Sequence, residues 1–295
     1  MKPDDFGTWM VGETVRVDSA LGRWVPNDAP ARLGEAMRYG VLDGGKRLRP
    51  LLVLAACEAV GGDTDAALRA AVAVELIHAY SLIHDDMPCM DNDVLRRGKP
   101  TVHVRFGEAQ AMLAGDAMQA LAFELLTADD GVAPELQARL CSLLARAAGH
   151  AGMAGGQAID LASTGASLDE VARSDLHRRK TGALLQASVL MGAACGVTTP
   201  TCWAALSDYG SAVGLAFQVV DDILDVTQAS DTLGKTAGKD MTDNKPTYVS
   251  VLGLEAARER ADQLCAQAHA ALQRSGLGGA ARLNLLADMI VERDR

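Results

Sequence analysis

The chain has 295 residues, of which 49% are hydrophobic and 22% charged, so it can bury a core as one large domain or two ordinary ones. Only 4% of the residues are aromatic, whereas 51 are alanine, a bias that favours helices over strands. The formal net charge of −10 argues against a broad nucleic-acid or anionic-membrane surface, although it allows a local basic patch.

The six cysteines include no C-x-x-C pair, which favours reduced thiols over a zinc or redox motif. The N-terminal residues carry acids and no apolar core of a signal peptide. The uncharged stretch from Thr181 to Ser207 is interrupted by Gly196 and Pro200, which favours two buried helix ends around a turn over a membrane span. We therefore expect a cytoplasmic protein without membrane insertion.

Apolar residues recur at helical spacing along most of the chain, first over 33–41 and 76–84. Further helical segments are expected over 105–127, 135–149, 169–195, 202–228, 254–274 and 279–293. Clusters of Gly, Pro, Asp and Asn separate these segments, and no period-2 strand pattern or long Pro/Ser-rich linker is present. The pattern predicts one all-α domain over 1–295, in which residues 1–30 form a peripheral segment.

The first of two acidic clusters follows the apolar run 70–83 and holds Asp85, Asp86 and Asp91. Six residues separate Asp85 from Asp91, about 240° around an ideal helix, so a continuing helix would not place both on one face. Pro88 disfavours such a helix. We therefore predict that the helix ends near Met87 and that the chain turns back, so that Asp85 and Asp91 reach the same metal ions.

The second cluster comprises Asp221, Asp222 and Asp225 at the end of another apolar helix. Asp221 and Asp225 lie one turn apart, where like charges repel each other. One such cluster is compatible with a solvated helix end. Two clusters at the ends of apolar helices predict a Mg²⁺ site, because hard carboxylate oxygens suit Mg²⁺, which completes its shell with water and substrate phosphates.

Four basic segments accompany the acids, at 44–50, 96–98, 177–182 and 235–245. Each alone is compatible with solvated surface charges, but together with two acidic clusters they predict diphosphate binding. His78 lies seven residues before Asp85 on the same helix face, which makes a phosphate contact competitive with a core or surface role. The small residues at 152–156 do not match a dinucleotide fingerprint and favour close helix packing or a kink.

With these motifs the chain resembles the all-trans prenyl diphosphate synthases, and within them the bacterial farnesyl diphosphate synthase branch. The resemblance rests on Gly44-Gly45-Lys46-Arg47-Leu48-Arg49-Pro50, the motif from Asp85 to Asp91 with Leu95-Arg96-Arg97-Gly98, His177-Arg178-Arg179-Lys180-Thr181-Gly182-Ala183, and Gly214-Leu215-Ala216-Phe217-Gln218 before Asp221-Asp222-Ile223-Leu224-Asp225. It implies a helical bundle around a deep cavity, a homodimer, and Mg²⁺-dependent condensation of isopentenyl diphosphate with dimethylallyl and then geranyl diphosphate to (2E,6E)-farnesyl diphosphate.

The resemblance also implies residue roles. Mg²⁺, with three ions per site assumed, would be bound by Asp85, Asp91 and Asp221, supported by Asp86, Asp222 and Asp225. Isopentenyl diphosphate would contact Lys46, Arg49, His78 and Arg97. The allylic diphosphate would contact Arg96, Lys180 and Lys235. Thr181 and Gln218 would stabilise the carbocation, Phe217 would join the substrate site, and Lys245 would close over it.

Product length is expected to depend on Tyr80 and Ser81, the residues five and four before the first aspartate motif. The resemblance places bulky Tyr80 at the pocket floor, as in enzymes that stop at fifteen carbons, although ideal helix geometry sets it about 140° from the face of Asp85. Two alternatives stay open: a sister synthase that makes geranyl or geranylgeranyl diphosphate, and a catalytically silent helical partner subunit. A terpene cyclase would not need the second diphosphate pocket of Lys46, Arg49 and His78.

Overall fold

The protein is described here by a computed structural model that covers residues 3–42, 44–128, 131–163, 170–227 and 247–294. Most of these residues are helical, and the strands among them are limited to one two-stranded antiparallel hairpin. In chain order the elements are α1 (Pro3–Trp24), η1 (Pro30–Arg32), α2 (Leu33–Val41), α3 (Leu48–Ala59), α4 (Thr64–Asp85), β1 (Leu95–Arg96), β2 (Lys99–Pro100), α5 (Val102–Phe106), α6 (Glu108–Leu126), α7 (Pro134–Ala148), α8 (Met153–Ala162), α9 (Glu170–His177), η2 (Arg178–Gly182), α10 (Ala183–Ala194), α11 (Pro200–Thr227), α14 (Tyr248–Leu252), α15 (Leu254–Ser275), α16 (Ala281–Val291) and η3 (Glu292–Asp294). The predicted all-α fold is confirmed.

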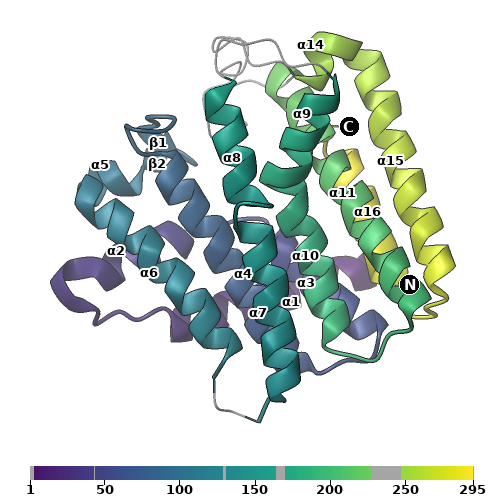
Figure 1. The fold of residues 1–295 in the computed structure, drawn as a ribbon, viewed down its shortest axis with the longest axis horizontal. Coiled ribbons are helices and arrows are strands. Elements are labelled where there is room, and N and C mark those ends of the chain that lie inside the picture. Colours follow the sequence, from purple (N-terminus) through teal and green to yellow (C-terminus); the bar gives the residue numbers. More distant parts are fainter. Residues whose placement is uncertain (1–2, 43, 129–130, 164–169, 228–246, 295) are drawn as a thin grey trace.

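The core is continuous through α3 and α10, which lie between two groups of helices (Figure 1). On one face of α10, Leu184 and Met191 pack with side chains of α4, α6 and α7. On the other face, Leu185 and Val189 pack with side chains of α11, α15 and α16. Because α10 is apolar on both faces, it belongs to the interior and not to the surface of the bundle.

The two helices that carry the acidic clusters end on the same side of the bundle. The C-terminal ends of α4, α8 and α11 all lie toward the top in Figure 1, where the C-terminus of the chain is also found. The start of α4 is fixed by Asp63, whose carboxylate accepts hydrogen bonds from the backbone N–H groups of Asp65 and Ala66. The bundle therefore gathers the motifs at one end.

Several helices begin and end close to the predicted residues, and two predicted helical segments differ from the structure. The expected helix over 105–127 is divided at Gly107, whose φ of 89° favours glycine. The expected segment over 169–195 contains a π-helical turn, η2, between α9 and α10. The uncharged stretch after Thr181 forms the end of one buried helix and the start of the next around a turn, as predicted.

Most of residues 1–30, which we expected to form a peripheral segment, form α1, a helix of 22 residues. Val17 and Leu21 of α1 are completely buried against the core, and Phe6 joins the second group of helices. The physical reason is the apolar face that α1 presents to α3 and α4.

Helix α4 is long and apolar enough to cross a membrane. However, 72% of its most apolar window is buried inside the protein. Burial in the core accounts for this composition, since a helix that is hydrophobic all round also fits the centre of a large bundle.

Candidate active site

The first acidic cluster is folded back on itself as predicted. Helix α4 ends at Asp85, and the backbone N–H of Asp91 then donates to the carbonyl oxygen of Asp85 at 2.9 Å. Burial raises the pKa of Asp85 to about 6; nearby Lys180 opposes this shift and Asp91 adds to it. The turn therefore brings the backbone of Asp91 to Asp85, whose own ionisation is unfavourable without a cation.

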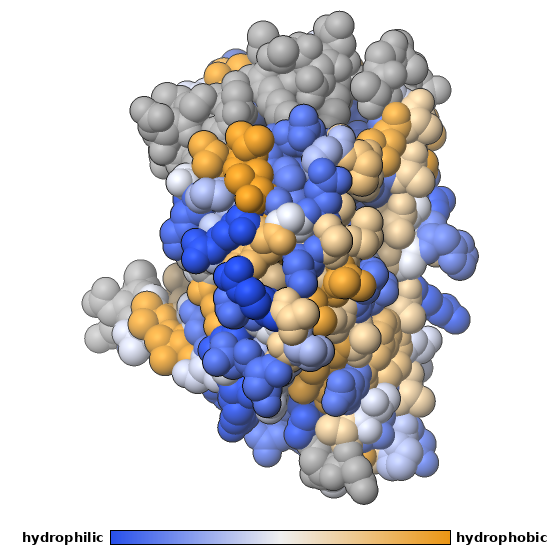
Figure 2. All heavy atoms as spheres, turned by 90° about the vertical axis from the view of Figure 1, so that its left-hand side faces the viewer, coloured by the Kyte–Doolittle hydropathy of each residue, from blue (hydrophilic) through white to orange (hydrophobic). Residues whose placement is uncertain are grey.

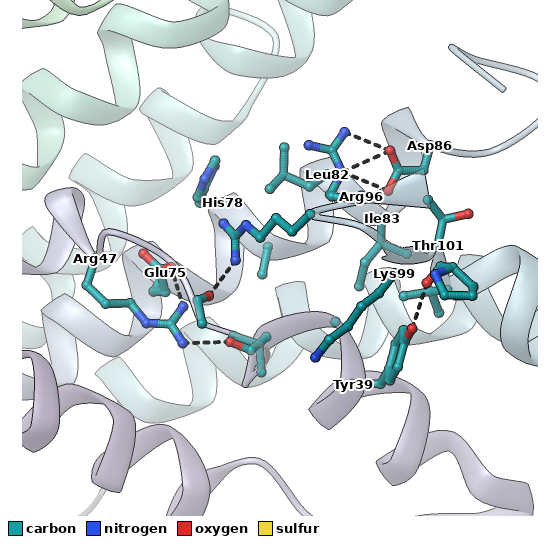
Figure 3. Close-up of a pocket in the computed structure, with 17 residues that line it drawn as sticks. Tyr39, Arg47, Glu75, His78, Leu82, Ile83, Asp86, Arg96, Lys99 and Thr101 are labelled. Atoms are coloured by element: carbon teal, nitrogen blue, oxygen red, sulfur yellow. Dashed lines mark hydrogen bonds and ion pairs between the residues drawn. The ribbon is translucent and has the colours of Figure 1, made fainter. Parts of the chain in front are cut away.

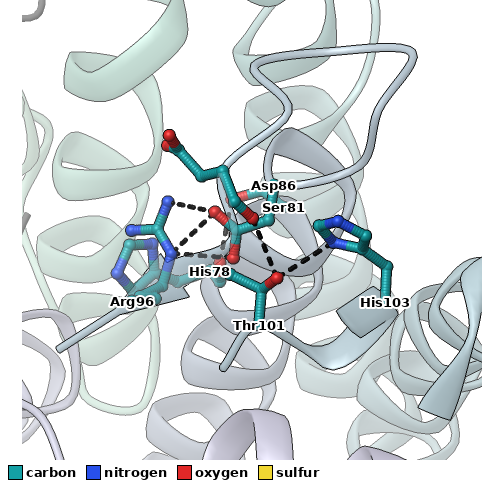
Figure 4. A network of polar contacts seen from close by, with 7 residues as sticks. His78, Ser81, Asp86, Arg96, Thr101 and His103 are labelled. Atoms are coloured by element: carbon teal, nitrogen blue, oxygen red, sulfur yellow. Dashed lines mark hydrogen bonds and ion pairs between the residues drawn. The ribbon is translucent and has the colours of Figure 1, made fainter. Parts of the chain in front are cut away.

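Asp86 points into a different environment. Arg96 binds both oxygens of its carboxylate, with N···O distances of 2.7 to 3.0 Å (Figure 4). The hydroxyl of Thr101 lies in the same network and is 3.0 Å from Nδ1 of His103. Asp86 and Arg96, predicted to contact metal and diphosphate, are thus paired with each other, and the pair ties the β1–β2 hairpin to α4.

In the second cluster, the three acids differ in their surroundings. The buried carboxylate of Asp222 accepts hydrogen bonds from Nε2 of Gln218 and from the backbone N–H of Tyr248, both at 2.8 Å. Asp221 is 41% exposed and lies 3.5 Å from the guanidinium of Arg293. Asp225 is buried. Asp222 therefore anchors the start of α14, whereas Asp221 stays partly exposed and its charge acts on Lys46 and Arg49.

The two arginines of the basic segment at 44–50 also differ in whether the protein supplies their partners. Arg47 is buried and binds Glu75 at 2.7 Å, Asp18 at 2.8 Å and the carbonyl oxygen of Val41 at 2.8 Å (Figure 3). Arg49 is also buried, but its Nε has no hydrogen-bond partner among the described residues. A buried donor without a partner is costly, so Arg49 is a group that an anionic ligand would satisfy.

Lys46 and His78 are two further predicted contacts of isopentenyl diphosphate, and their surroundings differ. Burial lowers the pKa of Lys46, and the positive charge of Arg293 adds to this, whereas Asp221 opposes it. Burial and the charge of Arg49 hold the pKa of His78 well below its usual value. His78 is therefore neutral at physiological pH and would contact a phosphate as an N–H donor, without a charge of its own.

The η2 turn places the next two predicted residues. Lys180 Nζ lies 2.6 Å from a carboxylate oxygen of Asp160 on α8. The hydroxyl of Thr181 donates to Oε1 of Gln218 at 3.0 Å and so links η2 to α11. A Cβ at Gly156 would lie 2.3 Å from the backbone N of Lys180, so only glycine lets α8 pack this closely, which confirms the predicted packing role of this segment.

Two adjoining pockets meet at His78. The larger is a cavity of about 380 Å³ whose lining includes Arg49, His78, Tyr80, Ser81, Asp85, Gln157, Lys180 and Thr181. The smaller, of about 50 Å³, lies between the Gly44 loop and the hairpin, and its lining includes His78, Asp86, Arg96 and Arg97 (Figure 3). Arg97 donates to the carbonyl oxygen of Gly44. The structure thus brings most of the predicted residues of α3, α4 and η2 to one place.

Three residues that the motifs did not single out also belong here. Asp160 binds Lys180, and Gln157, one turn earlier on α8, lines the cavity with buried side-chain N and O atoms that lack partners among the described residues. The guanidinium of Arg293 lies 4.4 Å from the centre of the Phe217 ring. In the sequence, the glutamine and aspartate that follow the glycines at 152–156 are the features that could have indicated a role of α8 in the site. Lys235 and Lys245 lie outside the described residues.

The donors fit a hard divalent cation. Asp85 and Asp91 supply only carboxylate oxygens, and Asp221 and Asp225 offer the same chemistry on α11. The raised pKa of Asp85 shows that its charge lacks full compensation from Lys180. The acids would hold the cation, and the neighbouring cations and N–H donors would hold phosphate.

This geometry agrees with comparisons to known proteins. Residues 30–275 match the model of the polyprenyl synthetase family. The heterodimeric geranylgeranyl pyrophosphate synthase large subunit 1 of Arabidopsis thaliana is 47% identical over 295 residues, which cover 98% of this chain and 80% of that protein.

Solved structures agree with this assignment. An FPP/GFPP synthase from Zymomonas mobilis has a TM-score of 0.86 at 44% identity and covers 97% of this chain and 99% of its own. A geranyltransferase from Helicobacter pylori, complexed with magnesium and isoprenyl diphosphate, has a TM-score of 0.84 at 34% identity and covers 99% of this chain and 97% of its own. With its folded-back aspartate motif and paired pockets, the chain belongs to the polyprenyl synthetase family, the all-trans prenyl diphosphate synthases.

Proposed function

We propose that this prenyltransferase makes farnesyl diphosphate by adding isopentenyl diphosphate to dimethylallyl and then to geranyl diphosphate. The observation that carries the proposal is the position of Tyr80 in the wall of the cavity that also holds Asp85. Five residues along α4 set Tyr80 about 7.5 Å from Asp85 along the helix axis. A hydrocarbon tail whose diphosphate lies at the aspartates would meet this ring.

Contacts with neighbouring side chains fix the position of the Tyr80 ring in the cavity lining. Its ring contacts that of His84 edge-on, with 5.7 Å between centroids, and its hydroxyl accepts a hydrogen bond from Nε2 of Gln119 at 3.5 Å. Burial raises the pKa of Tyr80, so the hydroxyl stays neutral. Burying one more five-carbon unit in an apolar pocket would make the binding free energy of the product more favourable by up to about 4 kcal/mol, at about 0.8 kcal/mol per buried CH₂. A fixed aromatic ring opposes that gain sterically.

In the proposed reaction, the C1–O bond of the allylic diphosphate breaks and its electron pair leaves with diphosphate. The π electrons of the isopentenyl diphosphate double bond then form the bond to C1, and the new cation gives a proton to the released diphosphate or to solvent, which restores a double bond. Bound Mg²⁺ would stabilise the negative charge on the departing diphosphate. Asp85, Asp91 and Asp221 would hold the metal, and Lys180 would contact the leaving group. Arg49 and neutral His78 would hold isopentenyl diphosphate, each through N–H donors.

Thr181 and Gln218 would act on the developing carbocation. The hydroxyl proton of Thr181 is directed to Oε1 of Gln218, so the lone pairs of the Thr181 oxygen are left for a positive charge in the cavity. Leu82, Met153 and Leu161 also line this cavity, and such apolar side chains would keep out water that would otherwise quench the cation.

Geranylgeranyl diphosphate is the second candidate product, because relatives 46–50% identical are named geranylgeranyl pyrophosphate synthases. The test is incubation with Mg²⁺, isopentenyl diphosphate and dimethylallyl diphosphate, followed by chain-length analysis of the products. A dominant fifteen-carbon product supports our proposal. A dominant twenty-carbon product would replace it with the second candidate, and no condensation would indicate a silent subunit.

The wall is tested by Tyr80→Ala, which we expect to shift the main product to twenty carbons or more. Tyr80→Phe is the matched control, because it keeps the ring and removes only the bond to Gln119, and its product should stay at fifteen carbons. An unchanged product with Tyr80→Ala would remove the role assigned to this side chain.

We further propose a cytoplasmic homodimer. The described cysteines are all unpaired thiols, as expected in a reducing compartment. Figure 2 views the side of α5 and α6, where Val104, Met112 and Leu113 are 49%, 41% and 52% exposed. If a second copy of the chain covered these side chains, their exposure in the single chain would be explained. Light scattering should give twice the chain mass, and a monomer would contradict the proposal.

A further inference from the structure

A second group of metal-binding side chains lies between α15 and α16. Cys265 and His269 are one turn apart on α15, and Asp288 faces them from α16. The His269 Nε2 lies 2.9 Å from Oδ1 of Asp288 and 3.8 Å from Sγ of Cys265, and Sγ lies 3.5 Å from the same carboxylate oxygen. Three different ligand atoms therefore converge within a few ångströms.

The geometry does not match a catalytic relay of thiol, imidazole and carboxylate. In such a relay the histidine uses one ring nitrogen for the nucleophile and the other for the carboxylate. Here a single nitrogen, Nε2 of His269, faces both Sγ of Cys265 and Oδ1 of Asp288. Side chains that converge on one point are arranged as ligands of a shared ion.

The distances fit tetrahedral zinc. Zinc bonds of about 2.3 Å to sulfur and about 2.0–2.2 Å to nitrogen and oxygen, at tetrahedral angles, separate the ligand atoms by about 3.4–3.6 Å. The separations in the structure, 2.9, 3.5 and 3.8 Å, differ from these values by up to about 0.5 Å. Small side-chain rotations would suffice, and no helix needs to move.

The local charge also favours a cation. Besides Asp288 itself, the carboxylates of Asp262 and Glu292 act on Cys265 and make the surroundings of the three side chains negative. A divalent ion would offset these carboxylates and take the thiolate. His269 and Asp288 are each 35% exposed, so an ion can enter from solvent and keep a water as fourth ligand.

We propose that Cys265, His269 and Asp288 form a zinc site that links α15 to α16, separate from the Mg²⁺-binding aspartates. Binding replaces the thiol proton of Cys265, which is released to solvent, and leaves His269 neutral. Mg²⁺ is excluded because it takes oxygen ligands and seldom thiolate. Because α16 leads into η3 and Arg293, the ion would also fix the helix that supports this neighbour of Asp221.

The test uses Co²⁺ as a spectroscopic substitute for Zn²⁺, added to the reduced full-length protein in excess Mg²⁺. We expect one Co²⁺ per chain, a thiolate-to-cobalt charge-transfer band, tetrahedral visible bands, and loss of both on addition of Zn²⁺. Cys265→Ser should abolish the charge-transfer band. Asp288→Asn should weaken Zn²⁺ binding by more than about 100-fold, beyond the effect typical of losing an outer-sphere partner.

Two controls make the result specific. Cys141→Ser, at another partly buried cysteine, should leave the cobalt spectrum unchanged. Asp85→Asn should also leave it unchanged, since that residue belongs to the aspartate site. Absence of the charge-transfer band in the wild type, or an equal band in Cys265→Ser, would overturn the proposal, and neither result depends on the prenyl transfer activity.

Discussion

Replacing Asp85 by asparagine should stabilise the metal-free protein while it removes activity. The pKa of Asp85 is about 6 in the folded protein against an ordinary value of 3.8. At 1.36 kcal/mol per pKa unit, the difference corresponds to about 3 kcal/mol. Asparagine keeps the shape of the side chain without a charge, so this penalty disappears.

The sign of the pH dependence follows from proton binding. Between about pH 4 and 6 the folded state holds a proton on Asp85 that the unfolded chain releases, so folding is less favourable as pH rises through this window. The Asp85 contribution is zero below about pH 4 and reaches about 3 kcal/mol of destabilisation above about pH 6. Asp85→Asn should therefore be more stable than wild type at pH 7.5 and equal to it at pH 4.

Urea unfolding without divalent metal measures this difference, with Glu259→Gln at an exposed position of α15 as the control, expected within about 0.5 kcal/mol of wild type. Addition of Mg²⁺ and inorganic diphosphate should stabilise the wild type but not Asp85→Asn, and kcat of the variant should fall by at least about 100-fold. Equal stability of both proteins at pH 7.5, or a pH-independent difference, would refute the reasoning.

Two further substitutions test how the site is supported. Gly156→Ala would press a methyl group against the backbone of Lys180, so we expect about 1–3 kcal/mol lower stability and a lower kcat with little change in the KM for isopentenyl diphosphate; unchanged kcat would show that the contact does not position Lys180. Arg47→Met would leave Glu75 buried without its charge partner and cost about 3–5 kcal/mol in urea unfolding, whereas Arg32→Met, in an exposed pair, should leave the urea midpoint close to that of the wild type.

The parts of the fold that depend on local pattern could be predicted from the sequence. The helices over 134–148, 200–227 and 254–275 agree with the apolar spacing to within a few residues. Pro88 correctly indicated the turn that brings Asp91 to Asp85. Both features are set by neighbours in the chain, which is why residue spacing was enough.

The parts that depend on distant contacts could not be predicted. Helix α8 contains two glycines, which disfavour helix locally, but Gly156 is needed for packing against Lys180. The pairing of Arg96 with Asp86 depends on the short β1–β2 hairpin, which has no strand pattern. Likewise, ideal helix geometry turned Tyr80 away from Asp85, whereas the cavity is wide enough to touch both.

Adjacent charges in the motifs have divided roles, and helix geometry explains why. Successive residues of a helix point about 100° apart, so two neighbouring carboxylates rarely face the same cavity. Asp85 lines the cavity while Asp86 holds Arg96, and Asp221 stays partly exposed while Asp222 holds α14. Asp86 and Asp222, which accept hydrogen bonds, fix the backbone, and this positions Asp85 and Asp221, whose carboxylates we expect to meet the ligand; Asp221 also lies 3.5 Å from Arg293. In this chain we therefore expect each aspartate pair to supply one ligand and one anchor, so that substitutions of the two should separate into losses of activity and losses of stability.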